Sequence, residues 1–305
     1  VMKEKKNTKA KRGSGVKKWS ILTAVVAILT VVSIVGTNIA LSAGQAINIF
    51  LKTDTYKIVD KGNGKEDTTY FESDFDSVEE LEENGKKVAE QLHTEGAVLL
   101  KNNEVLPLKK DAKVSTLSHS SVDMVTCGTG AADIDTSNAP TLKEALESRG
   151  VSVNSTLWDF YTKGAGKEYV RTPGKEANQE NQSGRAGWHI NEVPASAYTN
   201  EVKSSFAQYK DAAIVTISRI SGEGSDLAVD EFKDGKNVLS LTAEEQDMLK
   251  MAKSNFENVI VLINSTNALE CDFIDNEASD IDAVLWIGYT GGWGLNGVAD
   301  ILVGN

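Results

Sequence analysis

The distribution of apolar and polar residues divides the chain into three regions. From Trp19 to Leu51 there is no charged residue, and the run WSILTAVVAILTVVSIVGTNIALSA is about long enough to cross a bilayer as a helix. Residues 44–69 have a mixed composition that predicts a linker. Over residues 70–305, short apolar runs alternate with amphipathic segments, which predicts a single folded domain.

The domain is predicted to alternate strands with helices. Its strongest strands, at 211–218, 258–264 and 281–288, are apolar on both faces, which is typical of a parallel sheet covered by helices on both sides. Further strands are expected in AVLLKN, at 112–119 and at 151–154, and helices at 73–96, 141–150, 201–210, 241–255 and 294–304. We therefore expect an α/β fold, with a mostly parallel sheet sandwiched between helices and one transmembrane helix before it. Residues 161–200 are polar and are expected to form an exposed insertion.

Capping signals support two of these helices. Ser77 is placed to cap the first, with acidic residues in its first turn and Gly96 at its end. Thr242 and Glu245 have the spacing of a capping box at the start of the helix at 241–255.

The basic residues that precede the apolar run predict its orientation. Residues 1–18 hold eight Lys/Arg and one Glu, so this tail is expected to be disordered and cytoplasmic, with the domain on the extracellular side of the cell membrane. Residues 19–43 are predicted to be a transmembrane signal anchor. The alternatives are a signal peptide cut near Ala40–Ser42, which would lead to secretion, and a buried helix of a soluble fold.

Charge and composition restrict the class of partner. The net charge is −12, and because the tail contributes +7, the remaining residues carry −19. This acidic charge of the residues after the tail argues against nucleic-acid binding, which needs a basic surface. It suits a domain that handles a neutral ligand.

The cysteines and histidines predict no metal centre. Cys127 and Cys271 are too few for a metal cluster or a disulfide framework, and both follow apolar runs, so buried free thiols are expected, with one disulfide between them as the alternative. His93, His119 and His189 are scattered along the chain.

Two glycine-rich turns are candidates for functional loops. The strand at 211–218 runs directly into RISGEGSD, where Gly222 and Gly224 flank Glu223. Glycines allow the backbone angles and the close approach that a loop needs to reach a neighbouring surface. From spacing alone, Glu223 is more simply a solvated turn residue. The turn CGTGAAD (127–133) lacks the lysine of a phosphate-binding loop, so we interpret it as a packing turn, with a place near substrate as the alternative.

Several segments together resemble the α/β sandwich domain of glycoside hydrolase family 3. The similarity runs through EGAVLLKNNEVLPL, TLKEALESRGVSVN, the strand ending in SRISGEGSD, the helix beginning LSLTAEEQ, and AVLWIGYTGGWGLNGVADILVG. It covers about residues 70–305. Members of this family normally add a (β/α)₈-like barrel that carries an aspartate nucleophile in a Ser-Asp-Trp-like motif. Most members place the barrel first, and a subgroup from fermenting bacteria places the sandwich first.

The chain departs from the family pattern because it contains no barrel. Asp74 and Asp226 follow serines, but neither lies in a barrel strand or precedes a tryptophan, so no nucleophile is assigned. The membrane segment leaves no room for a barrel before the sandwich. The resemblance therefore implies a sandwich-first arrangement in which the barrel is expected downstream and residues 70–305 form a sandwich domain that is incomplete at its C-terminus.

The resemblance gives Glu223 a role. A retaining glycosidase needs two carboxyl groups about 5–5.5 Å apart, one as nucleophile and one as general acid/base. In this family the sandwich domain supplies the acid/base from a loop, and Glu223 matches that position. Arg219, Asp226 and Trp293 are expected to contact substrate. The simpler interpretations are an ordinary ion pair for Arg219, a turn-shaping role for Asp226 and packing for Trp293, which stands where the family often has a more polar residue.

These observations lead to two hypotheses. The first is an O-glycosyl hydrolase that acts with retention on β-glucosides or short β-glucan or xylan oligosaccharides, to which this chain contributes the acid/base domain; alone, without the barrel, the chain is expected to be inactive. The resemblance implies no metal and no organic cofactor. The second is a catalytically inactive, membrane-tethered module that binds a glycan or a partner.

Overall fold

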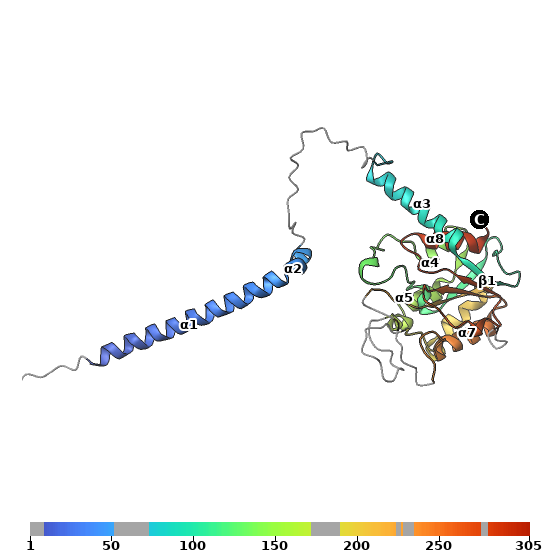
Figure 1. Ribbon diagram of the computed structural model, residues 1–305. Coiled ribbons are helices and arrows are strands. Elements are labelled where there is room, and N and C mark those ends of the chain that lie inside the picture. The colour runs from blue at the N-terminus through green and yellow to red at the C-terminus, as the bar shows by residue number, and fades with distance from the viewer. Residues whose placement is uncertain (1–8, 52–72, 172–189, 224–226, 228–234, 276–279) are drawn as a thin grey trace, which may run out of the picture. The chain divides into compact units, whose positions relative to one another are not determined.

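The computed structural model describes residues 9–51, 73–171, 190–223, 227, 235–275 and 280–305 (Figure 1). Contacts divide the chain into two compact units, Val1–Ser73 and Asp74–Asn305. The resemblance to a mostly parallel α/β domain concerns the second unit.

The described part of the first unit consists of two helices, α1 (Lys9–Ser42) and α2 (Gly44–Leu51). Within α1, the 28 residues from Gly15 to Ser42 are long and apolar enough to cross a membrane. A signal sequence near an N-terminus has the same properties, so this helix supports a membrane span only weakly. Helix α2 occupies the start of the predicted linker at 44–69, and the rest of that linker lies outside the described residues.

The second unit is built on a six-stranded sheet in the order β1-β6-β5-β4-β2-β3. The strands are β1 (Val98–Asn102), β2 (Lys113–Leu117), β3 (Ser152–Val153), β4 (Ala212–Ser218), β5 (Val259–Asn264) and β6 (Ala283–Trp286). Only β1 is antiparallel to its neighbour, and the other strands run parallel. The predicted α/β class with a mostly parallel sheet is therefore confirmed.

The strand order reverses at β2. This strand pairs with β3 on one side and with β4 on the other, so the chain crosses back over β2 between them. The point between the carboxyl ends of β2 and β4 is the topological switch point of the sheet. Open α/β sheets bind their ligands in the crevice at this point, because the loops that leave the two strands diverge there.

Helices cover both faces of the sheet, as Figure 1 shows. Alternate residues of β4 face opposite ways: Ala213, Val215 and Ile217 lie in one core, and Ala212 and Ile214 lie in the other. The first core is closed by α5 (Ser155–Thr162), α6 (Asn200–Ser205) and α7 (Ala243–Asn255), and the second by α4 (Leu142–Glu147) and α8 (Gly294–Val303). This alternation explains why the strand sequences are apolar throughout.

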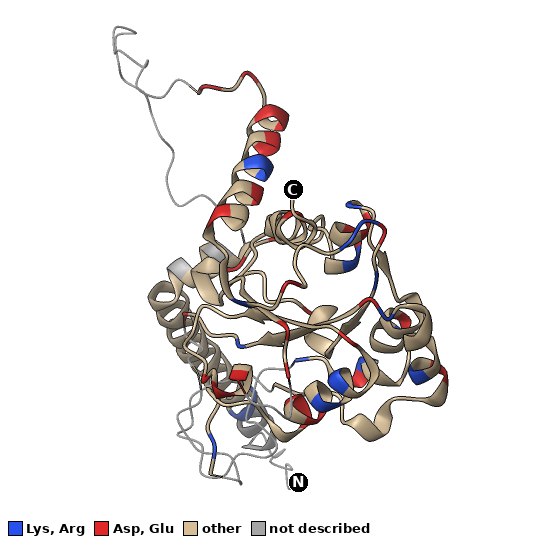
Figure 2. Cartoon of the chain, turned by 90° about the vertical axis from the view of Figure 1, so that its right-hand side faces the viewer, with Lys and Arg blue, Asp and Glu red and all other residues tan. Residues whose placement is uncertain are grey.

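Helix α3 (Val78–Gly96) packs on α8 and buries none of its own residues. Its cap is the predicted one, because the Ser77 side chain accepts a hydrogen bond from Glu80 N. Figure 2 shows acidic residues along α3. Its apolar residues Val78, Leu81, Val88 and Leu92 are between 45 and 65% exposed, and Val98, Leu99 and Leu100 of β1 between 44 and 52%. Apolar side chains of α3 and of the edge strand β1 are therefore partly exposed.

One expectation about residues 161–200 is wrong in part. Tyr161, Val193 and Tyr198 are buried in the core rather than exposed. Helix α5, which ends at Thr162 and overlaps the start of this segment, was not predicted. Aromatic rings explain the burial, since Phe160 lies 5.2 Å, centroid to centroid, from both Tyr161 and Tyr198. Residues 172–189 of this segment lie outside the described residues.

The contact between α3 and α8 yields a first prediction. A Cβ added to Gly297 would lie 2.3 Å from the Glu90 carbonyl oxygen, so Gly297→Ala forces the two helices apart. We expect a loss of about 1–3 kcal/mol in the free energy of unfolding, measured with urea.

The matched control is Gly85→Ala on α3, where a new Cβ meets nothing within 4 Å. Helix propensity alone then favours the alanine by about 1 kcal/mol, so the two variants should shift stability in opposite directions. An equal gain in both would show that α3 and α8 do not pack closely.

Candidate active site

Glu223 lies on an exposed loop that leaves the carboxyl end of β4. The loop backbone is fixed by residues that follow the two neighbouring strands. The Ser221 N–H donates to the Tyr289 hydroxyl at 2.9 Å, and Ser221 Oγ donates to Asn267 Oδ1 at 2.8 Å. Since Asn267 follows β5 and Tyr289 follows β6, three strand ends share one hydrogen-bonded cluster.

The turn after β2 contacts Glu223 directly. Thr129 Oγ1 donates to the Glu223 carbonyl oxygen at 2.9 Å, and the Ala131 N–H donates to Glu223 Oε2 at 2.9 Å. Glycines allow this approach: a Cβ on Gly130, which has a φ of +70°, would lie 2.7 Å from Glu223 Cβ, and one on Gly222 would lie 2.2 Å from Thr129 N. The CGTGAAD turn thus packs against the Glu223 loop and orients its carboxylate.

Asn264, the last residue of β5, joins these loops to the sheet. Its Nδ2 donates to the carbonyl oxygens of Val125 at 2.9 Å and Gly288 at 2.7 Å. Its Oδ1 accepts from Val125 N at 2.6 Å and from Ser218 Oγ at 2.9 Å. One buried amide therefore ties together the segments that follow β2, β4 and β6.

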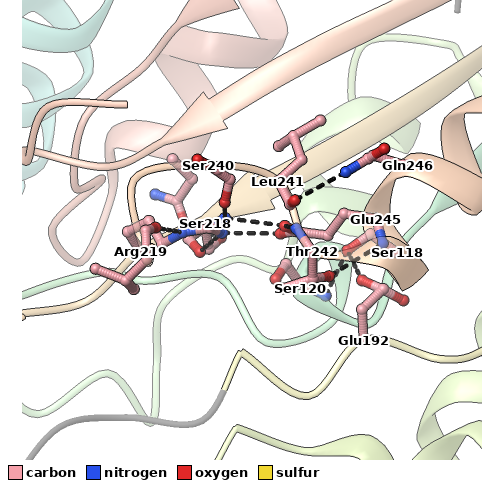
Figure 3. A network of polar contacts seen from close by, with 12 residues as sticks. Ser118, Ser120, Glu192, Ser218, Arg219, Ser240, Leu241, Thr242, Glu245 and Gln246 are labelled. Atoms are coloured by element: carbon pink, nitrogen blue, oxygen red, sulfur yellow. Dashed lines mark hydrogen bonds and ion pairs between the residues drawn. The ribbon is translucent and has the colours of Figure 1, made fainter. Parts of the chain in front are cut away.

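Arg219 begins the loop that carries Glu223 and is only 2% exposed. Its guanidinium forms a bidentate pair with Glu245, with Nη1–Oε1 at 2.8 Å and Nη2–Oε2 at 2.9 Å (Figure 3). The remaining donors reach the carbonyl oxygens of Ser218, Val238 and Ser240. All five N–H groups are thus used inside the domain, so the structure places Arg219 where it supports the loop and away from the exposed surface of Glu223.

Glu192 is a second buried carboxyl group next to this region. It accepts a hydrogen bond from Ser118 Oγ at 2.5 Å (Figure 3). Its Oε1 also accepts from His119 N at 3.2 Å and Val193 N at 2.8 Å. Burial raises the pKa of Glu192 to about 7, although its hydrogen bonds act in the opposite direction. It anchors Ser118, which follows β2 and has a φ of 85°, at the start of the segment that leads to the CGTGAAD turn. Sequence analysis missed Glu192 because it belongs to the segment expected to be exposed.

Two further residues, Trp293 and Asp226, were expected at the substrate. Trp293 precedes α8, and the Lys86 ammonium group of α3 lies 4.6 Å from the centre of its ring. Asp226 and Gly224 lie outside the described residues. Cys127 and Cys271 are free thiols, partly exposed rather than buried. Within the described part of the chain, no group of three or more His, Cys, Asp or Glu side chains could hold a metal ion.

The arrangement offers one exposed carboxylate on a rigid backbone. Among the described residues, the carboxylate of Glu223 accepts one hydrogen bond, through Oε2 from the Ala131 N–H.

Comparison with known proteins identifies the family. Residues 97–305 match the glycosyl hydrolase family 3 C-terminal domain. A beta-glucosidase of Ruminococcus albus is 29% identical over 219 residues, which are 71% of this chain and 21% of the relative. Beta-glucosidase A of Butyrivibrio fibrisolvens is 30% identical over 253 residues, which are 73% of this chain and 29% of the relative.

Solved structures of beta-glucosidases are also similar to this chain. Beta-glucosidase 3B from Thermotoga neapolitana, in complex with glucose, has a TM-score of 0.56 and 27% identity, covering 73% of this chain and 29% of that one. A beta-glucosidase from Paenibacillus barengoltzii has a TM-score of 0.57 and 26% identity, covering 73% and 23%. The chain belongs to glycosyl hydrolase family 3, which confirms the resemblance, and it spans less than a third of the length of these relatives.

The buried ion pair yields a second prediction. Glu245→Gln removes the negative charge and leaves the Arg219 guanidinium buried without its counter-ion. Breaking one partner of such a pair costs about 3–5 kcal/mol, which we expect as a loss of unfolding free energy in urea. Glu244→Gln, one residue earlier on α7, is the control and should cost at most about 1 kcal/mol. Equal losses in the two variants would contradict the role of the pair.

The raised pKa of Glu192 yields a third prediction. Native Glu192 keeps its proton up to about pH 7, whereas an unfolded glutamate loses it near the ordinary value of 4.5. Folding therefore takes up a proton between these pH values, and stability falls as the pH rises through this window, by up to about 3 kcal/mol. Glu192→Gln should flatten this dependence, measured as unfolding free energies at about pH 5 and about pH 8. A slope as steep as that of the parent protein would exclude Glu192 as its source.

Proposed function

We propose that this chain supplies the general acid/base of a retaining β-glucosidase-type hydrolase, and that Glu223 is this group. The observation that carries the proposal is the position of Glu223. It is an exposed carboxylate at the carboxyl edge of the sheet, on a loop whose backbone is held by Thr129, Asn267 and Tyr289. The names of the relatives, all beta-glucosidases, support a β-glucoside as substrate. Short β-glucan or xylan oligosaccharides belong to the proposal without that support.

The proposed chemistry has two steps. A carboxylate nucleophile attacks the anomeric carbon while Glu223 gives its proton to the departing glycosidic oxygen, so that the leaving group departs as a neutral alcohol. Glu223 then takes a proton from water, whose oxygen displaces the enzyme carboxylate from the anomeric carbon. The nucleophile belongs to a barrel domain in this proposal. Arg219 and Glu245 act as positioning residues, and contacts of Asp226 and Trp293 with substrate remain proposals.

Residues 1–18 were expected to be disordered, but from Lys9 onward they belong to α1. We also infer that this basic end of the chain stays in the cytoplasm, so that the hydrolase domain lies outside the cell. The support is the cluster of Lys and Arg within residues 1–18, since positive charges next to a membrane helix favour the cytoplasmic side. An extracellular β-glucosidase domain would meet oligosaccharides before their uptake.

The acid/base role is tested by the substitution Glu223→Gln in the full-length protein. The amide cannot donate a proton to a leaving oxygen in the manner of a carboxylic acid. For β-glucosides with sugar or alkyl leaving groups, kcat/KM should fall by about 10²–10⁴-fold. For activated aryl β-glucosides, whose leaving groups need no proton, the fall should be far smaller.

Glu257→Gln is the matched control, because Glu257 is exposed and precedes β5 at the opposite edge of the sheet. It should leave both classes of substrate unaffected. Equal losses on both classes in Glu223→Gln would remove Glu223 as the acid. Absence of hydrolysis in the parent protein would favour the glycan- or partner-binding module.

A further inference from the structure

The loop between β6 and α8 is bonded to a histidine of α3. His93 Nε2 lies 2.8 Å from the carbonyl oxygen of Tyr289, and His93 Nδ1 lies 3.0 Å from that of Ala89, one turn earlier in the same helix. A carbonyl oxygen only accepts hydrogen bonds, so the contact with Tyr289 requires a proton on Nε2. The imidazole therefore donates to a residue 196 positions away in the sequence and ties α3 to the loop.

Packing fixes the histidine ring at this place. A Cβ added to Gly294, the first residue of α8, would lie 2.3 Å from His93 Nδ1 and 2.5 Å from its Cγ, so the ring lies directly on the main chain where the loop joins α8. Neighbouring main-chain groups of the loop bond to Thr126 and Asn264. Among the described main-chain groups of the loop, the Tyr289 carbonyl oxygen is the one that bonds to α3.

Tyr289 joins α3 to the loop that carries Glu223. Its carbonyl oxygen accepts from His93, and its hydroxyl oxygen accepts from Ser221 N at 2.9 Å and from Asn267 Nδ2 at 3.3 Å. Ser221 is two residues before Glu223. The tyrosine side chain between these contacts is a rigid ring with two rotatable bonds, so a displacement of its main chain also displaces the hydroxyl group.

We propose that His93 is a positioning residue for Glu223, and that through Tyr289 and Ser221 it determines where the acid/base carboxylate meets the glycosidic oxygen. The proposal rests on the proposed function, to which it adds a residue of α3 that acts through other residues. A general acid must lie within about 2.6–3.2 Å of the atom that it protonates, so a small displacement of the loop slows proton transfer. Leaving groups that need no proton do not depend on this geometry.

The test makes His93→Phe in the full-length protein and compares a β-linked glucose disaccharide with 4-nitrophenyl β-glucoside. Phenylalanine keeps a ring against Gly294 and removes the donor to Tyr289. On the disaccharide, kcat should fall about ten- to a hundredfold with KM changed less than about twofold, because a misplacement of about 1 Å can cost about 10²-fold in rate. On the aryl glucoside, kcat should change less than about threefold.

Two further variants separate positioning from loosening of α3. His93→Gln carries an amide N–H that can donate to Tyr289, and it should recover most of the lost disaccharide activity. Glu90→Ala is the matched control, because it removes the 2.6 Å hydrogen bond from Asn296 Nδ2, which joins α3 to α8 and not to the loop. It should lower the melting temperature about as much as His93→Phe and leave the ratio of the two activities unchanged. An equal change of the ratio in Glu90→Ala would overturn the proposal.

Tyr289→Phe tests the same link from its other end if His93→Phe does not fold. It removes the hydroxyl group that accepts from Ser221, so it should also lose disaccharide activity selectively. Where both variants fold, the double variant should lose less than about twofold more than Tyr289→Phe alone, because the two residues act through one link. No selective loss in Tyr289→Phe, or single losses that multiply in the double variant, would contradict the link.

Hydrogen exchange of the Ser221 amide distinguishes this proposal from the proposed function, because it needs no turnover. The Tyr289 hydroxyl protects this N–H, so His93→Phe should raise its exchange rate about five- to tenfold, and Glu90→Ala should not. Activity that depends on Glu223, with unchanged Ser221 exchange and an unchanged substrate ratio in His93→Phe, keeps the acid and removes the role of His93. If the parent protein hydrolyses neither substrate, faster exchange supports the link and unchanged exchange overturns it.

Discussion

The buried ion pair between Arg219 and Glu245 determines where the loop that carries Glu223 begins. A guanidinium inside the domain is tolerated only when its charge is neutralised and its donors are satisfied, and here every donor has a partner. The end of β4, the segment at 238–240 and the first turn of α7 must therefore assemble together. The loop leaves the sheet from a fixed residue, and its next contacts, with Asn267, Tyr289 and Thr129, fix its direction.

The rest of the edge is held largely by main-chain groups. The Asn264 side chain forms hydrogen bonds with main-chain groups of Val125 and Gly288. Ala131 contributes only its main-chain N–H to Glu223. Such contacts depend little on side-chain identity, apart from the glycines that permit close approach. The domain thus presents a carboxylate on a stiff support rather than enclosing a reaction centre, which agrees with a site completed by a second domain.

Sequence patterns predicted the fold well where burial is regular. Strands β4, β5 and β6 are apolar on both faces, and that pattern gave both their positions and their parallel pairing. The capping box of Thr242 and Glu245 was also predictable, because it is local. The partnership of Glu245 with Arg219 was not, since it joins residues 26 positions apart and no local signal marks it. The burial of Tyr198 and Glu192 was not predicted, because most of the residues around them in the sequence are polar and the segment shows no apolar pattern. The role proposed for Glu223 comes from family resemblance, and the contact of Glu223 with Ala131 depends on two loops that meet in space.

The edge strand β1 has a consequence for association. Among the described strands it pairs with β6 alone, and the strand order places it at the border of the sheet, with Leu99 and Leu100 about half exposed. The other side of such a strand offers a row of unpaired N–H and C=O groups, which is a template for adding a further strand from any extended polypeptide. Burial of the apolar side chains of β1 would stabilise the added strand. The free side of β1 therefore favours association with other polypeptides. The solubility of the domain then depends on which segment or partner covers this strand.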